Sequence, residues 1–145
     1  MNCTDADMTD SGPRLTLDLL PGSYAICRLT PGEPLPPWAV QGAFFSVTRT
    51  PAELSIVCDA GAVPSGAVAE GPWSILAVEG PLDLNVTGVL AGLATPLAGA
   101  GISIFAISTY DTDYVRVRSH DIERAVRALR EAGHNVSDAG TSRGR

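Results

Sequence analysis

Alternating hydrophobic and polar positions open the ordered part of the chain and predict a strand at residues 15–19. Three leucines there alternate with a threonine and an aspartate, and successive side chains of a strand point to opposite faces. Pro21-Gly22 follows as a turn signal, and the apolar run Tyr24–Leu29 predicts a second strand. We expect these two strands to pair as a hairpin.

The rest of the first block is strand-rich and interrupted by proline. Residues 30–37 contain four prolines, which excludes regular structure because proline lacks a backbone donor. Residues 38–41 can form one helical turn. Residues 44–48 and 54–58 are rich in β-branched or aromatic side chains, so we expect them to form a further hairpin.

A second block begins after the Gly/Pro/Ala-rich residues 60–72, with a short apolar strand at 74–78. Leu90, Leu93 and Leu97 then recur at a helical spacing and define one apolar face. Asn85 or Thr87 can cap the start of this helix. Pro96 is expected to kink the helix or loosen its middle, and Gly99 and Gly101 are expected to end it.

The remainder of the second block completes a repeating pattern. Residues 102–107 are nearly all apolar and predict a central strand that is covered on one face by helices, and residues 114–118 alternate as a further strand. Ser119 or Asp121 can cap a second helix that Gly133 closes, and residues 134–136 add an edge strand. The core stripe of this helix is expected to consist of Ile122, Ala125, Val126 and Leu129. The order β-α-β-β-α-β is that of a split βαβ unit.

Composition narrows the class of protein. The chain has 145 residues, 45% hydrophobic and 18% charged, which suits one compact domain or two small fused ones. The net charge is -6 and every one of the ten cations is arginine, so we expect no nucleic-acid partner, because binding phosphates needs clustered cations. No run of about 18 apolar residues and no signal peptide is visible, which predicts a cytoplasmic protein with no membrane partner.

Cysteine and histidine give no metal or catalytic pattern. Cys3, Cys27 and Cys58 are far apart and lack a C-x-x-C pair, so neither a zinc site nor a disulfide framework is expected. His120 stands among helix-capping residues, and His134 follows a glycine near the end of the chain. No nucleophile–histidine pair has a supporting context, and Gly99-x-Gly101 lacks the rest of a dinucleotide fingerprint. We therefore expect no cofactor and no catalytic residues.

Two polar segments could carry recognition. Residues 108–113 (STYDTD) place two carboxylates and several hydroxyls on a strand-to-strand turn, which suits an ammonium group. The alternative is a polar turn that bonds to its own backbone. Residues 80–88 (GPLDLNVTG) approach a helix, where free backbone N–H groups favour a carboxylate; the alternative is an ordinary capped helix start. A calcium loop is excluded, because it would need an acid or amide where the chain has Val115, a glycine at Arg116 and a glutamate at Ile122.

These segments resemble a known family. Residues 53–58 (ELSIVC), 82–88 (LDLNVTG), 96–102 (PLAGAGI) and 105–114 (FAISTYDTDY) are similar to those of the CASTOR-type ACT domain proteins. The resemblance covers roughly residues 15–136, and its most specific part is residues 104–114.

The resemblance implies an α+β fold made of tandem ferredoxin-like (ACT, βαββαβ) units, the first degenerate, with antiparallel sheets and helices on one face. It also implies a flexible tail at 1–13, a degenerate unit at 14–71, an ACT domain at 72–138 and a second tail at 139–145. An amino acid would lie at a homodimer interface, its ammonium group on Asp113. The implied ligand-binding residues are Asp83, Leu84, Asn85, Val86, Thr87, Gly88, Thr109, Tyr110 and Asp113 of one subunit and Ser103 and Ile104 of the other.

One departure from the family pattern bears on the ligand. The arginine sensors of this family carry a glutamate for the guanidinium where this chain has Val86, which puts arginine in doubt. The leading hypothesis is a regulatory amino acid sensor that acts on an unidentified protein target or on its own oligomeric state. The alternative is a dimerisation or scaffold module without ligand. A small enzyme that uses Asp111 or Asp113 as a base is the least favoured of the three.

Overall fold

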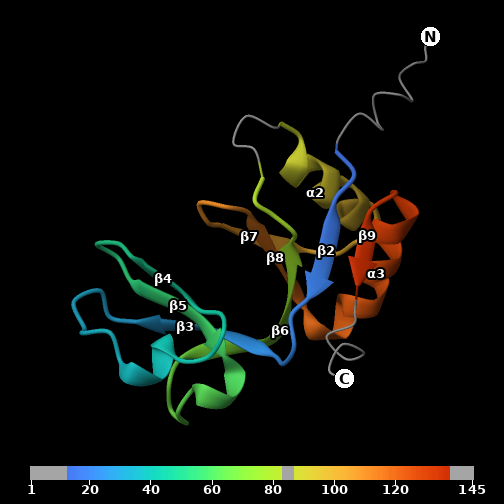
Figure 1. Cartoon of the computed structure of the whole chain (residues 1–145). Helices are drawn as coiled ribbons and strands as arrows, with labels where there is room; N and C mark the ends of the chain where they lie inside the picture. The colour runs from blue at the N-terminus through green and yellow to red at the C-terminus, as the bar shows by residue number, and fades with distance from the viewer. Residues whose placement is uncertain (1–12, 83–86, 138–145) are drawn as a thin grey trace. The chain divides into compact units, whose positions relative to one another are not determined.

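The computed structural model describes residues 13–82 and 87–137, and the chain divides into two compact units (Figure 1). One unit contains the described residues of Met1–Pro21 and Ile75–Arg145, and the other contains Gly22–Ser74. The long strand β6 (Ala69–Val78) is shared between the units: its residues up to Ser74 belong to the unit Gly22–Ser74, and its residues from Ile75 on belong to the other unit.

The unit that includes the chain's C-terminal half, called here the helical unit, has the predicted β-α-β-β-α-β order. Besides β6, its elements are β2 (Thr16–Leu19), α2 (Val89–Gly99), β7 (Ile104–Ser108), β8 (Asp113–Arg118), the 3-10 turn η3 (Ser119–Asp121), α3 (Ile122–Glu131) and β9 (Asn135–Ser137). Its strands lie in the order β9-β2-β6-β8-β7. This is a ferredoxin-like α+β arrangement with one additional strand, β2, between β6 and β9.

The expected hairpin between residues 15–19 and 24–29 is wrong. β2 pairs antiparallel with β6, where Leu17 is opposite Val78, and parallel with β9, where Leu17 is opposite Val136. Alternation along a strand defines which face is apolar but not which strand lies beside it. Insertion between two strands buries Leu17 completely, which a two-stranded hairpin would not do.

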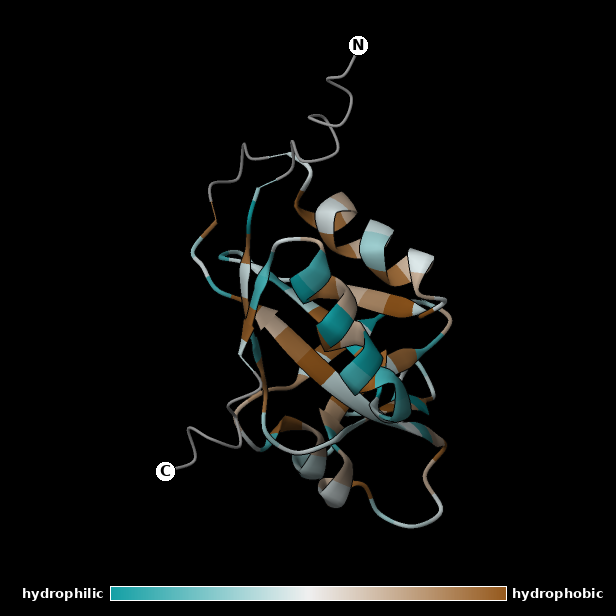
Figure 2. Ribbon diagram, turned by 90° about the vertical axis from the view of Figure 1, so that its right-hand side faces the viewer, coloured by the Kyte–Doolittle hydropathy of each residue, from teal (hydrophilic) through white to brown (hydrophobic). Residues whose placement is uncertain are grey.

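Both helices cover the same face of this sheet and form one core with it. Leu93 and Leu97 of α2 and Leu129 of α3 are fully buried with Leu76 of β6 and Val117 of β8. In Figure 2 strongly hydrophilic residues recur along α3, whereas α2 shows few of them. The predicted core stripe of α3 is confirmed: three of its residues are buried, and Ile122 packs against the core from a half-buried position.

Residues 102–107 do not form a central strand. Within the described ranges β7 pairs only with β8 and is therefore at the edge of the sheet. Phe105 pairs with Arg116, and the guanidinium carbon of Arg116 lies 4.2 Å from the centroid of the Phe105 ring. A cation over an aromatic face stabilises such a half-exposed ring. The apolar run at residues 102–107 therefore belongs to an edge strand, in which the Phe105 side chain is 49% exposed.

The predicted helix caps are corrected by the structure. The N-cap of α2 is Gly88, at a φ of 85°, and no side chain caps it; Thr87 precedes it, and Asn85 lies outside the described residues. The N-cap of α3 is Asp121, but its carboxylate accepts a hydrogen bond from Arg124 at 2.8 Å instead of a backbone N–H. α2 continues through Pro96 to Gly99.

The other unit, called here the strand unit, has no α-helix within its residues 22–74. Its elements are β3 (Tyr24–Leu29), the 3-10 turn η1 (Pro37–Val40), β4 (Ser46–Arg49), β5 (Leu54–Asp59), the 3-10 turn η2 (Ala60–Ala62) and the start of β6. The strands lie in the order β4-β5-β3-β6. The predicted hairpin of residues 44–48 and 54–58 is confirmed as β4 and β5. That this part of the chain is a degenerate ferredoxin-like unit stays a prediction.

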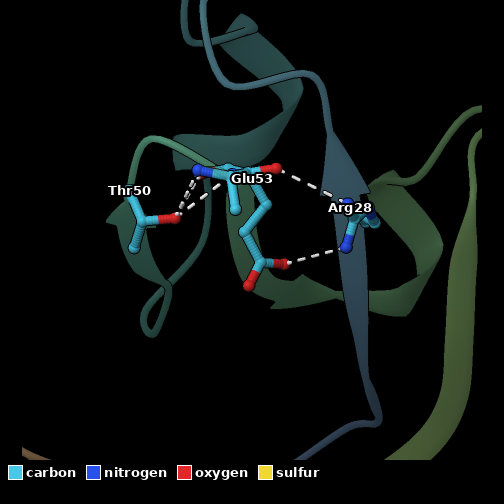
Figure 3. Close-up of polar contacts among 4 residues, drawn as sticks. Arg28, Thr50 and Glu53 are labelled. Atoms are coloured by element: carbon cyan, nitrogen blue, oxygen red, sulfur yellow. Dashed lines mark hydrogen bonds and ion pairs between the residues drawn. The ribbon is translucent and has the colours of Figure 1, made fainter.

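The turn between β4 and β5 is closed by side chains, as Figure 3 shows. Thr50 Oγ1 accepts hydrogen bonds from the backbone N–H groups of Ala52 at 3.1 Å and Glu53 at 3.2 Å. Arg28 of β3 pairs with Glu53, with 3.6 Å between Nη1 and Oε1. Both side chains are exposed, so this ion pair adds about 1 kcal/mol at most. Its effect is to tie the end of the hairpin to the neighbouring strand.

Candidate functional site

The polar cluster predicted at residues 108–113 forms the end of the β7–β8 hairpin. Ser108 and Asp113 are the last register pair of these strands, and the Ser108 hydroxyl donates a hydrogen bond of 2.6 Å to Asp113 Oδ1. Within the described residues no donor reaches the second oxygen, Oδ2, of this half-buried carboxylate. Asp113 can therefore accept a further charge-assisted hydrogen bond from a ligand.

Residues 109–112, called here the β7–β8 turn, are held by their own polar groups. Thr109 N–H donates to the carbonyl of Thr112 at 2.8 Å, and Thr112 N–H donates to Thr109 Oγ1 at 3.2 Å. Tyr110 is 85% exposed at the tip, and Asp111 beside it is exposed as well. The polar-turn interpretation thus holds for the two threonines, while the tyrosine and Asp111 face solvent.

The structure brings the chain before α2 directly against this turn. Residues 79–82, called here the approach segment, follow β6, and Leu82 N–H donates a 2.7 Å hydrogen bond to the carbonyl of Asp111. A second bond of 2.7 Å runs from Thr112 Oγ1 to the carbonyl of Val78. The two polar segments singled out in the sequence, about 30 residues apart, are therefore neighbours in space.

The two segments approach so closely at Gly80 that an added side chain would be tightly placed. A Cβ atom on Gly80 would lie 3.0 Å from Thr112 Cβ, 3.1 Å from the carbonyl oxygen of Asp111 and 3.3 Å from Leu82 N. Two of these atoms belong to the backbone, so a side chain here would push the backbone of the two segments apart by a few tenths of an ångström. Gly80 thus favours the close approach of the two segments, and neither its role nor that of Thr112 was predicted. The Gly80-Pro81 pair was the available signal in the sequence.

The predicted ligand-binding residues separate into three groups. Thr109, Tyr110 and Asp113 lie at the turn end of the hairpin. Ser103 and Ile104 lie at the other end of β7, since Ile104 pairs with Val117 and not with Asp113; four residues of strand place them roughly 13 Å away.

The third group precedes α2. Thr87 and Gly88 are exposed at the start of that helix, whereas Asp83, Leu84, Asn85 and Val86 lie outside the described residues. The described residues of one chain thus place Ser103 and Ile104 apart from the β7–β8 turn.

The two histidines have different surroundings. His120 Nε2 lies 3.6 Å from Asp121 Oδ2, and its side chain is 75% exposed. His134 is buried, and both ring nitrogens are engaged: Nδ1 with the N–H of Leu15 at 3.1 Å and Nε2 with the carbonyl of Gly92 at 3.0 Å. Both nitrogens of His134 thus connect backbone segments.

Two family models match parts of the chain. The family model of the ACT domain matches residues 68–131, and the model of an N-terminal domain matches residues 22–66. No helix between residues 13 and 82 or 87 and 137 has the length and apolar character needed to span a membrane.

The chain is similar to one curated relative over part of that protein's length and to one solved structure over nearly its whole length. The "Cytosolic arginine sensor for mTORC1 subunit 1" of Bos taurus is 32% identical over 97 residues, which are 59% of this chain but only 30% of that relative. The crystal structure of Atu0741 from Agrobacterium tumefaciens is 42% identical, with a TM-score of 0.82 over 86% of this chain and 93% of that chain.

The fold extends to more distant proteins. The ligand-free regulatory subunit of aspartate kinase from Thermus thermophilus has a TM-score of 0.53 at 15% identity, over 77% of this chain and 93% of that chain. At this identity the likeness concerns the fold alone.

Proposed function

We propose that this chain, which belongs to the CASTOR-type ACT domain proteins, is a regulatory protein that binds an amino acid at a site containing the β7–β8 turn. The relative named above is an arginine sensor, and this chain aligns with about a third of its length. The proposal therefore concerns the class of ligand and leaves the downstream target unidentified. In line with the name of that relative, we propose a cytosolic location and a binding rather than a catalytic role.

The observation that carries the proposal is the contact between Leu82 and Asp111. It holds a segment that leads into a helix beside a turn that presents carboxylates. A helix start favours a bound carboxylate, and Asp113 can accept an ammonium group. The two charged groups common to all amino acids would thus find complementary partners on adjacent segments of one unit.

A second copy of the chain would complete this site. Ser103 and Ile104 lie at the end of β7 remote from Asp113, so a ligand on the turn of one subunit would meet them only from another subunit. β7 is an edge strand within the described ranges, and a symmetric homodimer brings identical surfaces together. Sedimentation should give a dimer at micromolar concentration, and a monomer there would contradict this part of the proposal.

Calorimetric titration with leucine, methionine, alanine, arginine and lysine tests the ligand class. We expect a neutral, mostly apolar amino acid to bind most tightly, because Ile104 is apolar and Val86 stands where the arginine sensors carry a glutamate. Burial of an unpaired cation costs several kcal/mol, whereas an apolar side chain gains about 0.8 kcal/mol per buried CH₂. Tightest binding of arginine or lysine would show that Asp83 or Asp111 has replaced the glutamate.

A dimerisation module without ligand is the second candidate, and the exposed edge strand favours it. Phe105 of β7 is 49% exposed beside an unpaired strand edge within the described ranges, and edges of this kind recruit further strands. Thermal denaturation with the same amino acids separates the candidates. Ligand at 100 times its dissociation constant should add about 2.7 kcal/mol of stability, whereas a dimer that no amino acid stabilises supports the module.

A further inference from the structure

Thr112 bonds to two different parts of the chain around the candidate site, Thr109 and Val78. Its backbone N–H and carbonyl close the turn on Thr109, at 3.2 Å and 2.8 Å. Its side-chain hydroxyl points the other way and donates 2.7 Å to the carbonyl of Val78, 34 residues earlier in the chain. Thr112 is half-buried, so this hydrogen bond is partly shielded from water and is stronger than an exposed one.

The consequences of this bond extend to the approach segment. Val78 is the last residue of β6, and the chain continues through Gly80, which passes against Thr112, to Leu82, which bonds to Asp111. Two hydrogen bonds thus hold this stretch of chain to the β7–β8 turn, one at Val78 just before the approach segment and one at Leu82 within it. Only the first depends on a specific side chain, and that side chain is Thr112.

We infer that Thr112 is the positioning residue of the site: its hydroxyl bonds to the end of β6 and so holds the turn, with Tyr110 and the adjoining Asp113, beside the approach segment. This inference rests on the amino acid-binding function proposed above. Thr112 does not need to contact the ligand. Without its hydroxyl the turn keeps its own backbone bonds but loses its polar anchor on β6, and ligand binding must then order both segments at its own cost.

The test compares Thr112→Val, which removes the hydroxyl at nearly constant size, with Thr112→Ser, which keeps it. Thr95→Val is the matched control, because Thr95 is exposed on α2 and makes no hydrogen bond through its hydroxyl among the described residues. The first readout is hydrogen exchange of the Leu82 amide, measured by NMR on the full chain. We expect faster exchange at Leu82 in Thr112→Val, with Thr112→Ser and Thr95→Val close to the wild type.

The second readout is calorimetric titration with the amino acid that the wild type binds best among leucine, methionine, alanine, arginine and lysine. We expect an affinity about five- to tenfold lower in Thr112→Val, as for the loss of one hydrogen bond, and recovery in Thr112→Ser. Unchanged exchange at Leu82, or unchanged affinity in Thr112→Val, overturns the inference. If the wild type binds none of the five amino acids, the proposed function fails, and Thr112 then has no role at a ligand site. Exchange of the Leu82 amide still decides whether Thr112 holds the approach segment to the turn.

Discussion

His134 Nδ1 accepts a hydrogen bond from the backbone N–H of Leu15 at 3.1 Å, across 119 residues of sequence. The ring is buried, and its other nitrogen lies 3.0 Å from the carbonyl of Gly92 in α2. Since Nδ1 accepts, Nε2 carries the proton and donates to Gly92. One neutral imidazole therefore links the start of β2, the first turns of α2 and the start of β9 in the helical unit.

Replacement of His134 should destabilise this unit. His134→Ala leaves the buried N–H of Leu15 and the carbonyl of Gly92 without their partner, and each buried polar group left unpaired costs about 1–3 kcal/mol. Urea unfolding should show the loss, while His120→Ala, at a side chain that is 75% exposed, should change the free energy of unfolding by less than about 0.5 kcal/mol. Equal midpoints for the two variants would contradict the linking role of His134.

Asp113 should control ligand affinity without controlling the fold. Asp113→Asn keeps an oxygen for the Ser108 hydroxyl but removes the charge, so the affinity for an amino acid should fall about ten- to a hundredfold, as for a charge-assisted hydrogen bond. The matched control is Asp121→Asn, whose carboxylate pairs with Arg124 at 2.8 Å away from the turn. It should retain the wild-type affinity in calorimetric titration. Equal loss in both variants, each shown to be folded by circular dichroism, would rule out this assignment of Asp113.

A side chain at position 80 should separate the approach segment from the turn. In Gly80→Ala the new Cβ meets Thr112 Cβ and the Asp111 carbonyl at 3.0 Å and 3.1 Å, and overpacking of this kind costs about 1–3 kcal/mol. Gly99→Ala is the control, because no heavy atom lies within 4 Å of its Cβ; it should change stability by less than about 1 kcal/mol. Thermal unfolding of both variants would reveal the difference. A stable Gly80→Ala would show that the two segments can move apart freely.

The buried thiols of the strand unit should make it sensitive to alkali. Burial raises the pKa of Cys58 from 9.0 to about 12, and the nearby Cys27 thiol adds to this. Because the folded pKa lies above the unfolded one, the stabilising effect of the neutral thiol is complete below pH 9 and is lost as the pH rises toward 12. The expected slope is up to about 1.4 kcal/mol per pH unit.

Cys58→Ala should flatten this alkaline decline in chemical unfolding, although the cavity lowers its stability at neutral pH. Burial also raises the pKa of Cys27, so the variant retains part of the decline. A decline as steep as that of the wild type would show that groups other than Cys58 cause it.

Periodicity alone was sufficient for the elements that depend on local spacing. The stripe of α3 and the order β-α-β-β-α-β followed from the positions of apolar residues, because a helix or strand places its side chains at fixed intervals whatever surrounds it. The turn at residues 108–113 was also visible, since hydroxyl and carboxylate side chains favour turns by bonding to nearby backbone. The candidate ligand residues came from the family resemblance and not from periodicity, and their role in binding remains a prediction.

Tertiary structure alone decided which elements became neighbours. The alternation at residues 15–19 defined an apolar face but could not reveal that β2 inserts between β6 and β9, and the apolar run at 102–107 could not distinguish an edge strand from a central one. The bonds from Thr112 to Val78 and from His134 to Leu15 join residues 34 and 119 positions apart. Side-chain periodicity carries no information about such pairs, because their geometry exists only once the sheet has assembled and its helices have packed against it.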